Sequence, residues 1–547
     1  MIITKQKPFE EIIQFLASYT LIFICGCSEC ATLCKTGGEE EAKAMKDKLE
    51  KEGKIVTGWA VLDPACHRLN NAKIFREHKS QIDQSDALLV LACGNGTQTV
   101  AGGVEKPVYP GCDTLFLGEI MRFGNFEERC QLCGQCLLDL TGGICPITRC
   151  SKSLLNGPCG GSKDGKCEIN PEMECGWQLI IDRLKKRGKL DALKNIILPK
   201  DWSTSRDGGL RKFQISKQEK APVPSQKRPS RQLTSSDMER SSRRSSGSKL
   251  EKILRENIFA VTAELGPPKG ADPQPVKAKA EILRKCADAV NITDNQTGIV
   301  RMSSIACAAI LLQLGIEPVV QMVTRDRNRL ALQSDVLGAA GLGVKNFLCL
   351  SGDHQKFGNH PQAKNVYDLD SVQLILALRE MQDERKFLSG DKLSSPPSLF
   401  IGAVENPYAD PFEFRSIRLG KKIAAGCDFI QTQAVFDVPK FEKWLSILKD
   451  EGLTEKVYIL AGVIPIKSVG MVRYMRDYVS GVSVPDEIVT RMENSKKPKK
   501  EGMKICVEII DQLKQIKGVK GIHIMAVAWE EVIPQIVEEA KLLPRPS

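Results

Sequence analysis

The sequence predicts an α/β protein in which a small parallel α/β domain and a loop-rich cysteine module precede a (β/α)8 TIM barrel. Three observations lead to this fold class. Apolar runs alternate with amphipathic stretches in both halves of the chain, as strand–helix units require. Fifteen of the twenty cysteines lie between Cys25 and Cys175. Eight strand candidates follow residue 250, which matches the size and strand number of one barrel.

Residues 1–124 are expected to form the small α/β domain, which opens with a short amphipathic helix. Its strands are expected at 20–25, 55–62, 87–92 and 107–109, with a helix at 39–54. In such sheets, binding sites form beyond the carboxyl ends of the strands. The cysteines expected at this edge are Cys25, Cys27, Cys30, Cys34, Cys66, Cys93 and Cys112. Zinc, an iron–sulfur cluster and a docking surface for a redox partner all remain open there.

Residues 125–198 are expected to form a cysteine-rich iron–sulfur module that ends in a helix at 176–187. Cys130, Cys133 and Cys136 make the C-x2-C-x2-C run of ferredoxin-type [4Fe–4S] clusters. A Cys-Pro pair at Cys145 comes nine residues after Cys136, which leaves the fourth ligand open. The other candidate ligands are Cys150, Cys159, Cys167 and Cys175. Eight thiolates suffice for two clusters, or for one cluster and one zinc.

Residues 199–249 are rich in Ser, Lys, Arg, Pro and Gln, a composition that predicts a basic disordered linker. Much of the net charge of +11 lies near it. No nucleic-acid recognition motif accompanies this charge, so we expect a solvated spacer and no nucleic-acid partner. The chain has no apolar run long enough for a membrane span. Glu10 and Glu11 stand where a signal peptide would be basic, so a cytoplasmic protein is expected.

Residues 250–547 carry the strand–helix repeat of the expected barrel, with an open doubly wound sheet as the alternative. The expected strands are 259–263, 289–292, 317–321, 346–350, 399–403, 429–432, 457–461 and 521–525. Polar residues follow several of them. Glu264 precedes Pro267-Pro268, Asp353 lies in a Ser-Gly-Asp sequence, and Gln433 closes Ala-Gly-Cys-Asp-Phe-Ile-Gln-Thr-Gln. Barrel enzymes place catalytic groups at these strand ends.

These motifs resemble the methylenetetrahydrofolate reductase family over residues 255–540. The cysteine-rich region before them is similar to the module that accompanies such reductases in anaerobic bacteria with a Wood–Ljungdahl type of one-carbon metabolism. The resemblance implies a flavin, FAD in preference to FMN, that reduces 5,10-methylenetetrahydrofolate to 5-methyltetrahydrofolate. It also implies [4Fe–4S] clusters, with zinc as a further option.

The resemblance implies a role for each matched residue. Glu264 is the general acid, Asp353 lies near the flavin and pterin, and Gln433 contacts the folate. Thr293 and Lys422 contact the flavin, and Gln321 stands where the family commonly has a flavin-side histidine.

The segment that begins at His523 lacks the tyrosine and asparagine of pyridine-nucleotide-dependent relatives. Electrons are therefore expected through the clusters, from ferredoxin or another electron-transfer protein, within an oligomer or a larger redox complex. Two alternatives stay open: a methyltransferase that moves the methyl group of methyltetrahydrofolate to a corrinoid protein without flavin, and a non-catalytic electron-transfer subunit.

Overall fold

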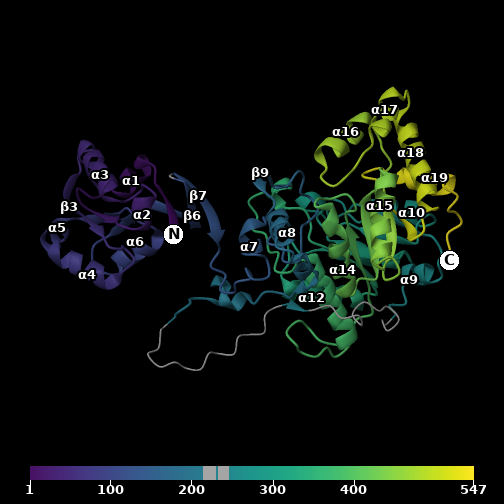
Figure 1. Ribbon diagram of the computed structural model, residues 1–547, viewed down its shortest axis with the longest axis horizontal. Helices are drawn as coiled ribbons and strands as arrows, with labels where there is room; N and C mark the ends of the chain where they lie inside the picture. The colour runs from purple at the N-terminus through teal and green to yellow at the C-terminus, as the bar shows by residue number, and fades with distance from the viewer. Residues whose placement is uncertain (123, 214–229, 232–244, 547) are drawn as a thin grey trace. The chain divides into compact units, whose positions relative to one another are not determined.

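The computed structural model describes residues 1–122, 124–213, 230–231 and 245–546 (Figure 1). The chain divides into two compact units, an N-terminal unit Met1–Gly134 and a C-terminal unit Gln135–Ser547. Among the described residues, no helix combines the length and the apolar composition needed to cross a bilayer. The predicted division into four domains stays a prediction.

A four-stranded parallel sheet forms the centre of the N-terminal unit, in the order β3-β2-β4-β5. The strands are β2 (Leu21–Cys27), β3 (Ile55–Leu62), β4 (Ala87–Val90) and β5 (Val108–Pro110). These confirm the strands expected from the apolar runs. Helix α3 (Glu39–Lys51) buries Ala42, Met45 and Leu49. Its first turn carries three glutamates and its last turn two lysines, which complements the helix dipole.

A second, antiparallel sheet in the same unit was not predicted. It consists of β1 (Ile2–Gln6), β6 (Cys112–Arg122) and β7 (Asn125–Cys130), in the order β1-β6-β7. The amino terminus, expected as a helix, therefore begins with a strand, and helix α1 (Phe9–Phe15) follows it. The reason is a distant partner, because β1 pairs with β6 from Ile2 opposite Leu117 to Gln6 opposite Cys112.

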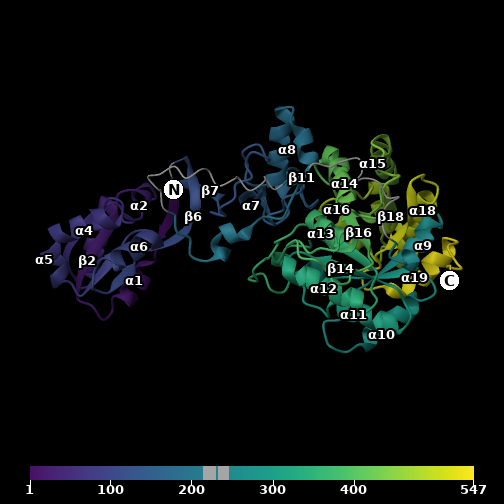
Figure 2. The same cartoon turned by 90° about the horizontal axis from the view of Figure 1, so that it is seen from below.

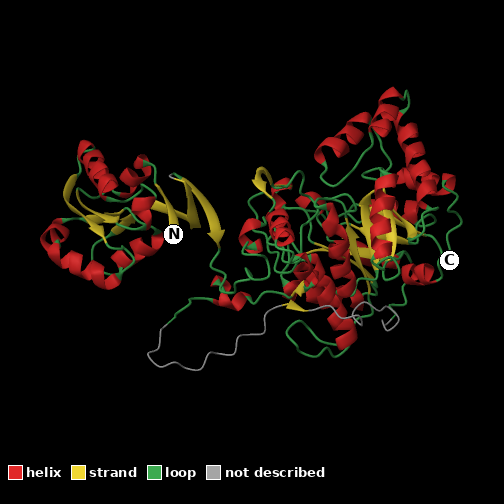
Figure 3. Ribbon diagram, in the orientation of Figure 1, coloured by secondary structure: helices red, strands yellow, loops and turns green. Residues whose placement is uncertain are grey.

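The C-terminal unit contains a closed barrel of eight parallel strands, β12 to β19 in sequential order (Figure 3). The strands are β12 (Ala260–Leu265), β13 (Ala289–Ile292), β14 (Pro318–Val323), β15 (Asn346–Leu350), β16 (Phe400–Glu405), β17 (Phe429–Ala434), β18 (Tyr458–Val463) and β19 (Val519–Ile524). Pairing of β12 with β19 closes the barrel, which rules out the open sheet. All eight expected strands are confirmed.

Helices surround this barrel and also close one end of it. The surrounding helices include α10 (Gln274–Leu283), α11 (Ser304–Gln313), α12 (Arg329–Gly341), α13 (Ser371–Arg379), α14 (Arg415–Ala424), α15 (Val438–Asp450) and α18 (Pro498–Leu513). Helix α9 (Lys249–Arg255) packs Leu250, Ile253 and Leu254 against the first residues of the strands, such as Ala260 and Ala289. The amino ends of the strands are thus sealed, and the carboxyl ends stay available for a site.

Residues 135–198, the cysteine segment, pack against the barrel within the C-terminal unit. The segment contains α7 (Pro146–Arg149), β8 (Lys166–Cys167), β9 (Asn170–Glu174) and α8 (Gly176–Lys186), so the predicted terminal helix is confirmed. Trp177, Ile181 and Leu184 of α8 share an apolar cluster with Phe414, which directly precedes α14. Both views in which they are labelled place α8 beside α14 (Figure 2).

Asp370, the N-cap of α13, attaches the cysteine segment to the barrel. Its Oδ2 accepts the backbone N–H groups of Leu155 (3.2 Å) and Asn156 (2.8 Å) and the side-chain amide of Asn156 (3.0 Å). Its Oδ1 accepts the backbone N–H of Gln373 at 3.0 Å, which completes a capping box. One buried carboxylate therefore satisfies both the helix start and the docked loop.

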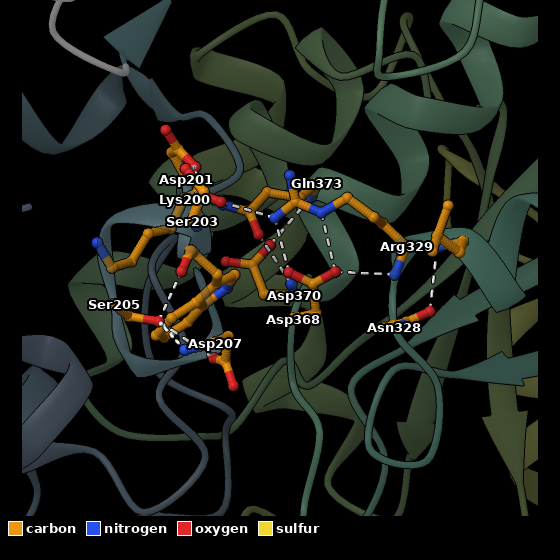
Figure 4. Close-up of polar contacts among 12 residues, drawn as sticks. Lys200, Asp201, Ser203, Ser205, Asp207, Asn328, Arg329, Asp368, Asp370 and Gln373 are labelled. Carbon is orange, nitrogen blue, oxygen red and sulfur yellow. Dashed lines mark hydrogen bonds and ion pairs between the residues drawn. The ribbon is translucent and has the colours of Figure 1, made fainter. Parts of the chain in front are cut away.

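The predicted linker, 199–249, lies in part outside the described residues, at 214–229 and 232–244. Its described amino-terminal end is folded. Arg329 donates to the carbonyl of Lys200 at 2.7 Å and pairs with Asp368 at 2.6 Å (Figure 4). Two short 3-10 turns, Trp202–Thr204 and Arg206–Gly208, follow.

Candidate functional site

A cavity of about 630 Å³ opens at the carboxyl ends of the barrel strands. Four of the residues predicted to serve the flavin or the folate line it: Gln321 on β14, Asp353 after β15, Lys422 on α14 and Gln433 on β17. Thr293 and Glu264 lie outside this lining. The volume is in the range of pockets that bind cofactors and other small molecules. The barrel thus brings together residues that lie more than a hundred positions apart in the sequence.

The loop that carries Asp353 is fixed by groups that the sequence motifs did not indicate. Asp353 accepts the backbone N–H of Thr297 at 3.0 Å, and its own carbonyl accepts Arg325 Nη1 at 2.8 Å. The neighbouring Ser351 also lines the cavity, and its buried hydroxyl has no hydrogen-bond partner among the described residues. A buried polar group without a partner is uncommon and indicates a ligand or water at that place.

A buried cluster of positive charge forms another wall. Lys422 pairs with Glu405 at 2.6 Å, and both side chains are almost fully buried. Burial lowers the pKa of Lys422 to about 8. Burial would raise the pKa of Glu405, but Lys422, Arg415 and Arg418 outweigh it, so that pKa is lowered. Cations therefore outnumber Glu405 here, which favours an anionic group in the cavity.

Arg415 connects this cluster to the cysteine segment. Its side chain is 1% exposed and lies 3.6 Å from Glu405, yet its guanidinium makes no hydrogen bond within the described part of the chain. Burial lowers its pKa to about 10, while Glu405 and Cys159 act in the opposite direction. Gly160 has φ +94°, and a Cβ there would lie 3.5 Å from Nη1 of Arg415. The positive φ would strain a residue with a side chain, so glycine suits this position in the loop after Cys159, next to the guanidinium.

A second, smaller cavity beside the first is lined by Cys150, Cys159, Cys167 and Cys175. Cys159, Lys152 and Glu168 line both cavities. Burial raises the pKa of the Cys150 and Cys159 thiols, to about 11 and about 12. The backbone N–H of Gly161 points at the Cys159 sulfur at 3.4 Å. Amide-to-sulfur bonds of this kind accompany cluster ligands.

The second cavity thus brings together four of the eight cysteines in this region, and the other four are divided between the two units. Cys130 and Cys133 belong to the N-terminal unit, whereas Cys136 and Cys145 belong to the C-terminal unit. Within the described residues, no three His, Cys, Asp or Glu side chains surround the position of a single metal ion.

Most of the sheet-edge cysteines lie next to strand ends of the N-terminal unit, but Cys25 does not, because it lies inside β2 and is fully buried. Cys27 ends β2, Cys30 begins α2 (Cys30–Leu33), and Cys34 caps that helix. Cys66 follows β3, Cys93 precedes α6 (Gly94–Ala101), and Cys112 begins β6.

A polar chain inside the barrel leads to Glu264. Gln431 donates to Thr262 at 3.1 Å and exchanges hydrogen bonds with Asn291. Thr262 contacts Nδ1 of His523 at 3.0 Å, and Nε2 of His523 lies 3.9 Å from Glu264. In the sequence, His523 was noted only because the segment that it begins lacks the tyrosine and asparagine of pyridine-nucleotide-dependent relatives. Its place on β19, which pairs with β12, is what makes it a neighbour of Glu264.

Comparison with known proteins gives two family matches. Residues 249–541 match the model described as methylenetetrahydrofolate reductase, and residues 109–203 match the one described as methylene-tetrahydrofolate reductase C terminal. The first match covers more than half of the chain. The chain belongs to the methylenetetrahydrofolate reductase family.

Curated relatives in this family include methylenetetrahydrofolate reductase 2 of Schizosaccharomyces pombe, 28% identical over 217 residues, which is 37% of this chain and 32% of that protein. A probable methylenetetrahydrofolate reductase (NADPH) of Caenorhabditis elegans is 22% identical over 247 residues, 44% and 35% of the two chains. The shared region thus spans about a third of these relatives' own length.

A solved structure of an uncharacterized Clostridium thermocellum protein, described as binding two copies of 5-methyl-5,6,7,8-tetrahydrofolic acid, is 17% identical with a TM-score of 0.39. It covers 54% of this chain and 99% of that one, and a likeness at this level carries no functional argument.

Proposed function

We propose that this reductase-family chain reduces 5,10-methylenetetrahydrofolate to 5-methyltetrahydrofolate with a bound flavin, and that [4Fe–4S] clusters deliver the electrons. The proposed electron route rests on the position of Cys159, which lines both the barrel cavity and the four-cysteine cavity. The reaction consumes two electrons and two protons, and a reduced iron–sulfur protein of the ferredoxin class supplies the electrons one at a time.

The lining of the barrel cavity suits a flavin. Asp353 and Gln321 can bond ring nitrogens and oxygens, and the free Ser351 hydroxyl offers a further contact. Lys422 and Arg418 give the cavity a cationic wall that suits a phosphate. When bound there, the flavin supplies hydride to the methylene carbon. Gln433 lies in the same wall, where it can orient the folate.

Glu264 is the proposed general acid for opening the five-membered ring at N5. Its side chain is 12% exposed, and His523 lies 3.9 Å away. Glu264 lies outside the cavity lining, but it is the second-last residue of β12, at the carboxyl end of the barrel where the cavity opens.

Cys150, Cys159, Cys167 and Cys175 are the proposed ligands of the cluster beside the barrel cavity. A cluster supplies one-electron steps, and thiolate ligation matches its iron. Lys152 and Arg415 place positive charge next to Cys159. This charge offsets the negative charge of a cluster with four thiolates in a buried place.

The experiment begins with the absorption spectrum of anaerobically purified protein. We expect flavin bands near 450 nm and a broad shoulder near 400 nm that dithionite bleaches. Glu264→Gln should lower the rate of methylenetetrahydrofolate reduction by reduced viologen by about a hundredfold or more and leave flavin content unchanged. A full rate in Glu264→Gln would overturn the assignment of the acid. A spectrum without flavin would favour the methyltransferase instead.

The electron route has its own test. Cys159→Ala should lose cluster iron and electron transfer from reduced ferredoxin, while dithionite still reduces the flavin. Cys506→Ala is the matched control, because Cys506 is a buried cysteine among the apolar residues of α18. Unchanged transfer from ferredoxin in Cys159→Ala would contradict the route.

A further inference from the structure

A side pocket of about 120 Å³ adjoins the barrel cavity and has no part in the function proposed above. Residues 479–483 form one of its walls, and they directly follow α16 (Val469–Tyr478; Figure 1). Val479 and Ser480 line the side pocket and the barrel cavity alike. Pockets that bind a whole small molecule usually have about 300 Å³ or more. The side pocket therefore suits one end of a ligand whose remainder lies in the barrel cavity.

Separate parts of the C-terminal unit supply the other walls of the side pocket. The lining residues outside 479–483 are Ser162 and Lys163 of the cysteine segment, Tyr408 and Asp410 after β16, Lys440 on α15 and Arg476 on α16. Hydrogen bonds join these parts. The Ser162 hydroxyl donates to the carbonyl of Asp410 at 3.1 Å, and Lys163 donates to the carbonyl of Asp477 at 3.2 Å. The cysteine segment thus completes a pocket that the barrel begins.

Gly481 fixes the side pocket against the wall of the barrel cavity. Its φ is +74°, and a Cβ there would lie 2.0 Å from Nδ2 of Asn406 and 3.0 Å from the carbonyl oxygen of Gly160. Asn406 and Gly160 both line the barrel cavity. Because only glycine tolerates this backbone conformation and this approach, the sequence at 481 is suited to keeping the two spaces adjacent.

Positive charge dominates the side pocket. Of its described lining residues, three are cations and one is a carboxylate: Lys163, Lys440, Arg476 and Asp410. The ammonium of Lys440 lies 5.5 Å from the centre of the Tyr408 ring, which places this cation over the buried floor of the pocket. Hydroxyl groups of Ser162, Ser480 and Ser483 also belong to the lining. Cations together with hydroxyl groups favour an oxyanion.

Other carboxylates near the side pocket lie outside its lining and are engaged elsewhere. Asp477 and Asp486 lie 2.8 Å and 3.5 Å from the guanidinium of Arg476. Asp437 caps α15 and accepts the hydroxyl of Ser483 at 3.1 Å. The charge of Arg476 is therefore partly compensated, and Lys163 and Lys440 carry most of the positive excess.

Two tyrosines of α16 lie where the side pocket meets the barrel cavity. Tyr474 and Tyr478 line the barrel cavity, and their stacked rings have centroids 5.7 Å apart. They are 60% and 76% exposed, so their faces are open to a ligand. An aromatic group stacks well on such a surface. The helix thus offers an aromatic contact, and the residues after it offer the cationic pocket.

The position of the side pocket favours the folate over the flavin as its ligand. Lys440 lies on α15, the helix that follows β17, and β17 carries Gln433, the proposed folate contact. The proposed flavin phosphate already has the cationic wall of Lys422 and Arg418. A folate carries an aromatic aminobenzoyl group that ends in the carboxylates of glutamate, which matches the order of the tyrosines and the side pocket.

We propose that the side pocket binds a carboxylate at the glutamate end of the folate through Lys163, Lys440 and Arg476. Tyr474 and Tyr478 contact the aminobenzoyl group. Through Lys163 the cysteine segment takes part in substrate binding, in addition to its proposed role in electron transfer. This assignment rests on the proposed function, because it takes the folate as the substrate.

The test measures binding without turnover. Equilibrium dialysis gives the Kd of 5-methyltetrahydrofolate for the full chain reduced with dithionite, in which the flavin cannot accept electrons from the ligand. The second ligand is 5-methyltetrahydropteroate, which lacks the glutamate. Lys440→Met and Lys163→Met should each raise the Kd of the folate about five- to tenfold and leave the Kd of the pteroate unchanged.

Lys443→Met is the matched control. Lys443 also lies on α15 and over an aromatic ring, 5.9 Å from the centre of Phe412, but it does not line the side pocket. Its replacement should change neither Kd. Flavin content is measured in every variant, because a phosphate of the flavin is the other oxyanion within reach of the pocket.

An unchanged Kd of the folate in both variants would overturn the proposal. Equal weakening of the two ligands would also overturn it, since the lysines would then act on the barrel cavity as a whole. Loss of flavin with folate binding intact would assign the pocket to the flavin phosphate instead. If the parent chain binds neither ligand, the proposed function itself is wrong, and this outcome is distinct from a failure of the pocket alone.

Discussion

Lys152 of the cysteine segment donates a hydrogen bond of 2.9 Å to the carbonyl of Gly352, in the loop after barrel strand β15. The same ammonium pairs with Glu168 at 2.5 Å and is 6% exposed. Burial alone would lower the pKa of Lys152, but Cys159 and Glu168 outweigh it, so the side chain keeps its charge. One cation thus holds together the four-cysteine cavity and the loop of Asp353.

Lys152→Met tests this connection. It keeps most of the apolar part of the side chain but leaves Glu168 and the Gly352 carbonyl without the Lys152 ammonium as donor, so the free energy of unfolding should fall by about 1–3 kcal/mol. Flavin reduction by ferredoxin should slow more than reduction by dithionite. Lys356→Met is the control, since exposed Lys356 makes a similar bond to the carbonyl of Ile169. Equal effects of the two variants in urea unfolding would contradict the prediction.

Asp370→Ala should detach the cysteine segment from α13. The variant leaves the N–H groups of Leu155 and Asn156 without an acceptor and removes a helix cap, so we expect a loss of about 2–4 kcal/mol in unfolding free energy. Hydrogen exchange of residues 150–160 should accelerate. Asp437→Ala removes the cap of α15 without touching the segment and should leave that exchange unchanged. If both variants accelerate it, Asp370 is not the specific anchor.

The barrel was predictable because each strand is a local apolar run and closure follows from their number. The strand β1 was not, since Ile2–Gln6 owes its conformation to β6, more than a hundred residues away. The packing of the cysteine segment against the barrel could not be predicted from the sequence either. It depends on single buried groups such as Asp370 and Lys152, whose partners no local pattern identifies.

The candidate site was likewise predictable from the sequence only in part. Barrel topology explains why Gln321, Asp353, Lys422 and Gln433 meet, because the carboxyl ends of the strands share one rim. The grouping of Cys150, Cys159, Cys167 and Cys175 has no regular spacing and became visible only in three dimensions. The roles of all these residues stay predictions.

His523→Gln should lower the rate without weakening folate binding. His523 is buried, and its Nε2 lies 3.9 Å from the carboxylate of Glu264, so it acts as a positioning residue for the proposed acid. We expect kcat for viologen-driven reduction to fall about tenfold, with KM for the folate nearly constant. His360→Gln, at an exposed histidine, should change neither constant. An unchanged kcat in His523→Gln would show that the imidazole does not position the acid.

Lys421→Met should reduce the pH dependence of stability. Burial lowers the pKa of Lys421 to about 7, from 10.5. Between these values the unfolded chain binds more protons than the folded one, so stability rises with pH across this window, by about 1.4 kcal/mol per pH unit for one such group. The variant removes this contribution, so the slope between pH 7 and 9 becomes less positive than in the parent chain.

Urea unfolding at pH 7, 8 and 9, under anaerobic reducing conditions, measures that slope. Lys449→Met is the matched control, because Lys449 is an exposed lysine in the last turn of α15 and its loss should leave the slope unchanged. A neutral Met in place of a desolvated ammonium should also raise stability most at pH 7, where the folded state of the parent chain bears the largest cost of burying that charge. If Lys421→Met keeps the full dependence of unfolding free energy on pH, Lys421 retains its proton in the folded chain. The buried positive charge along α14 would then be larger than the lowered pKa of Lys421 implies.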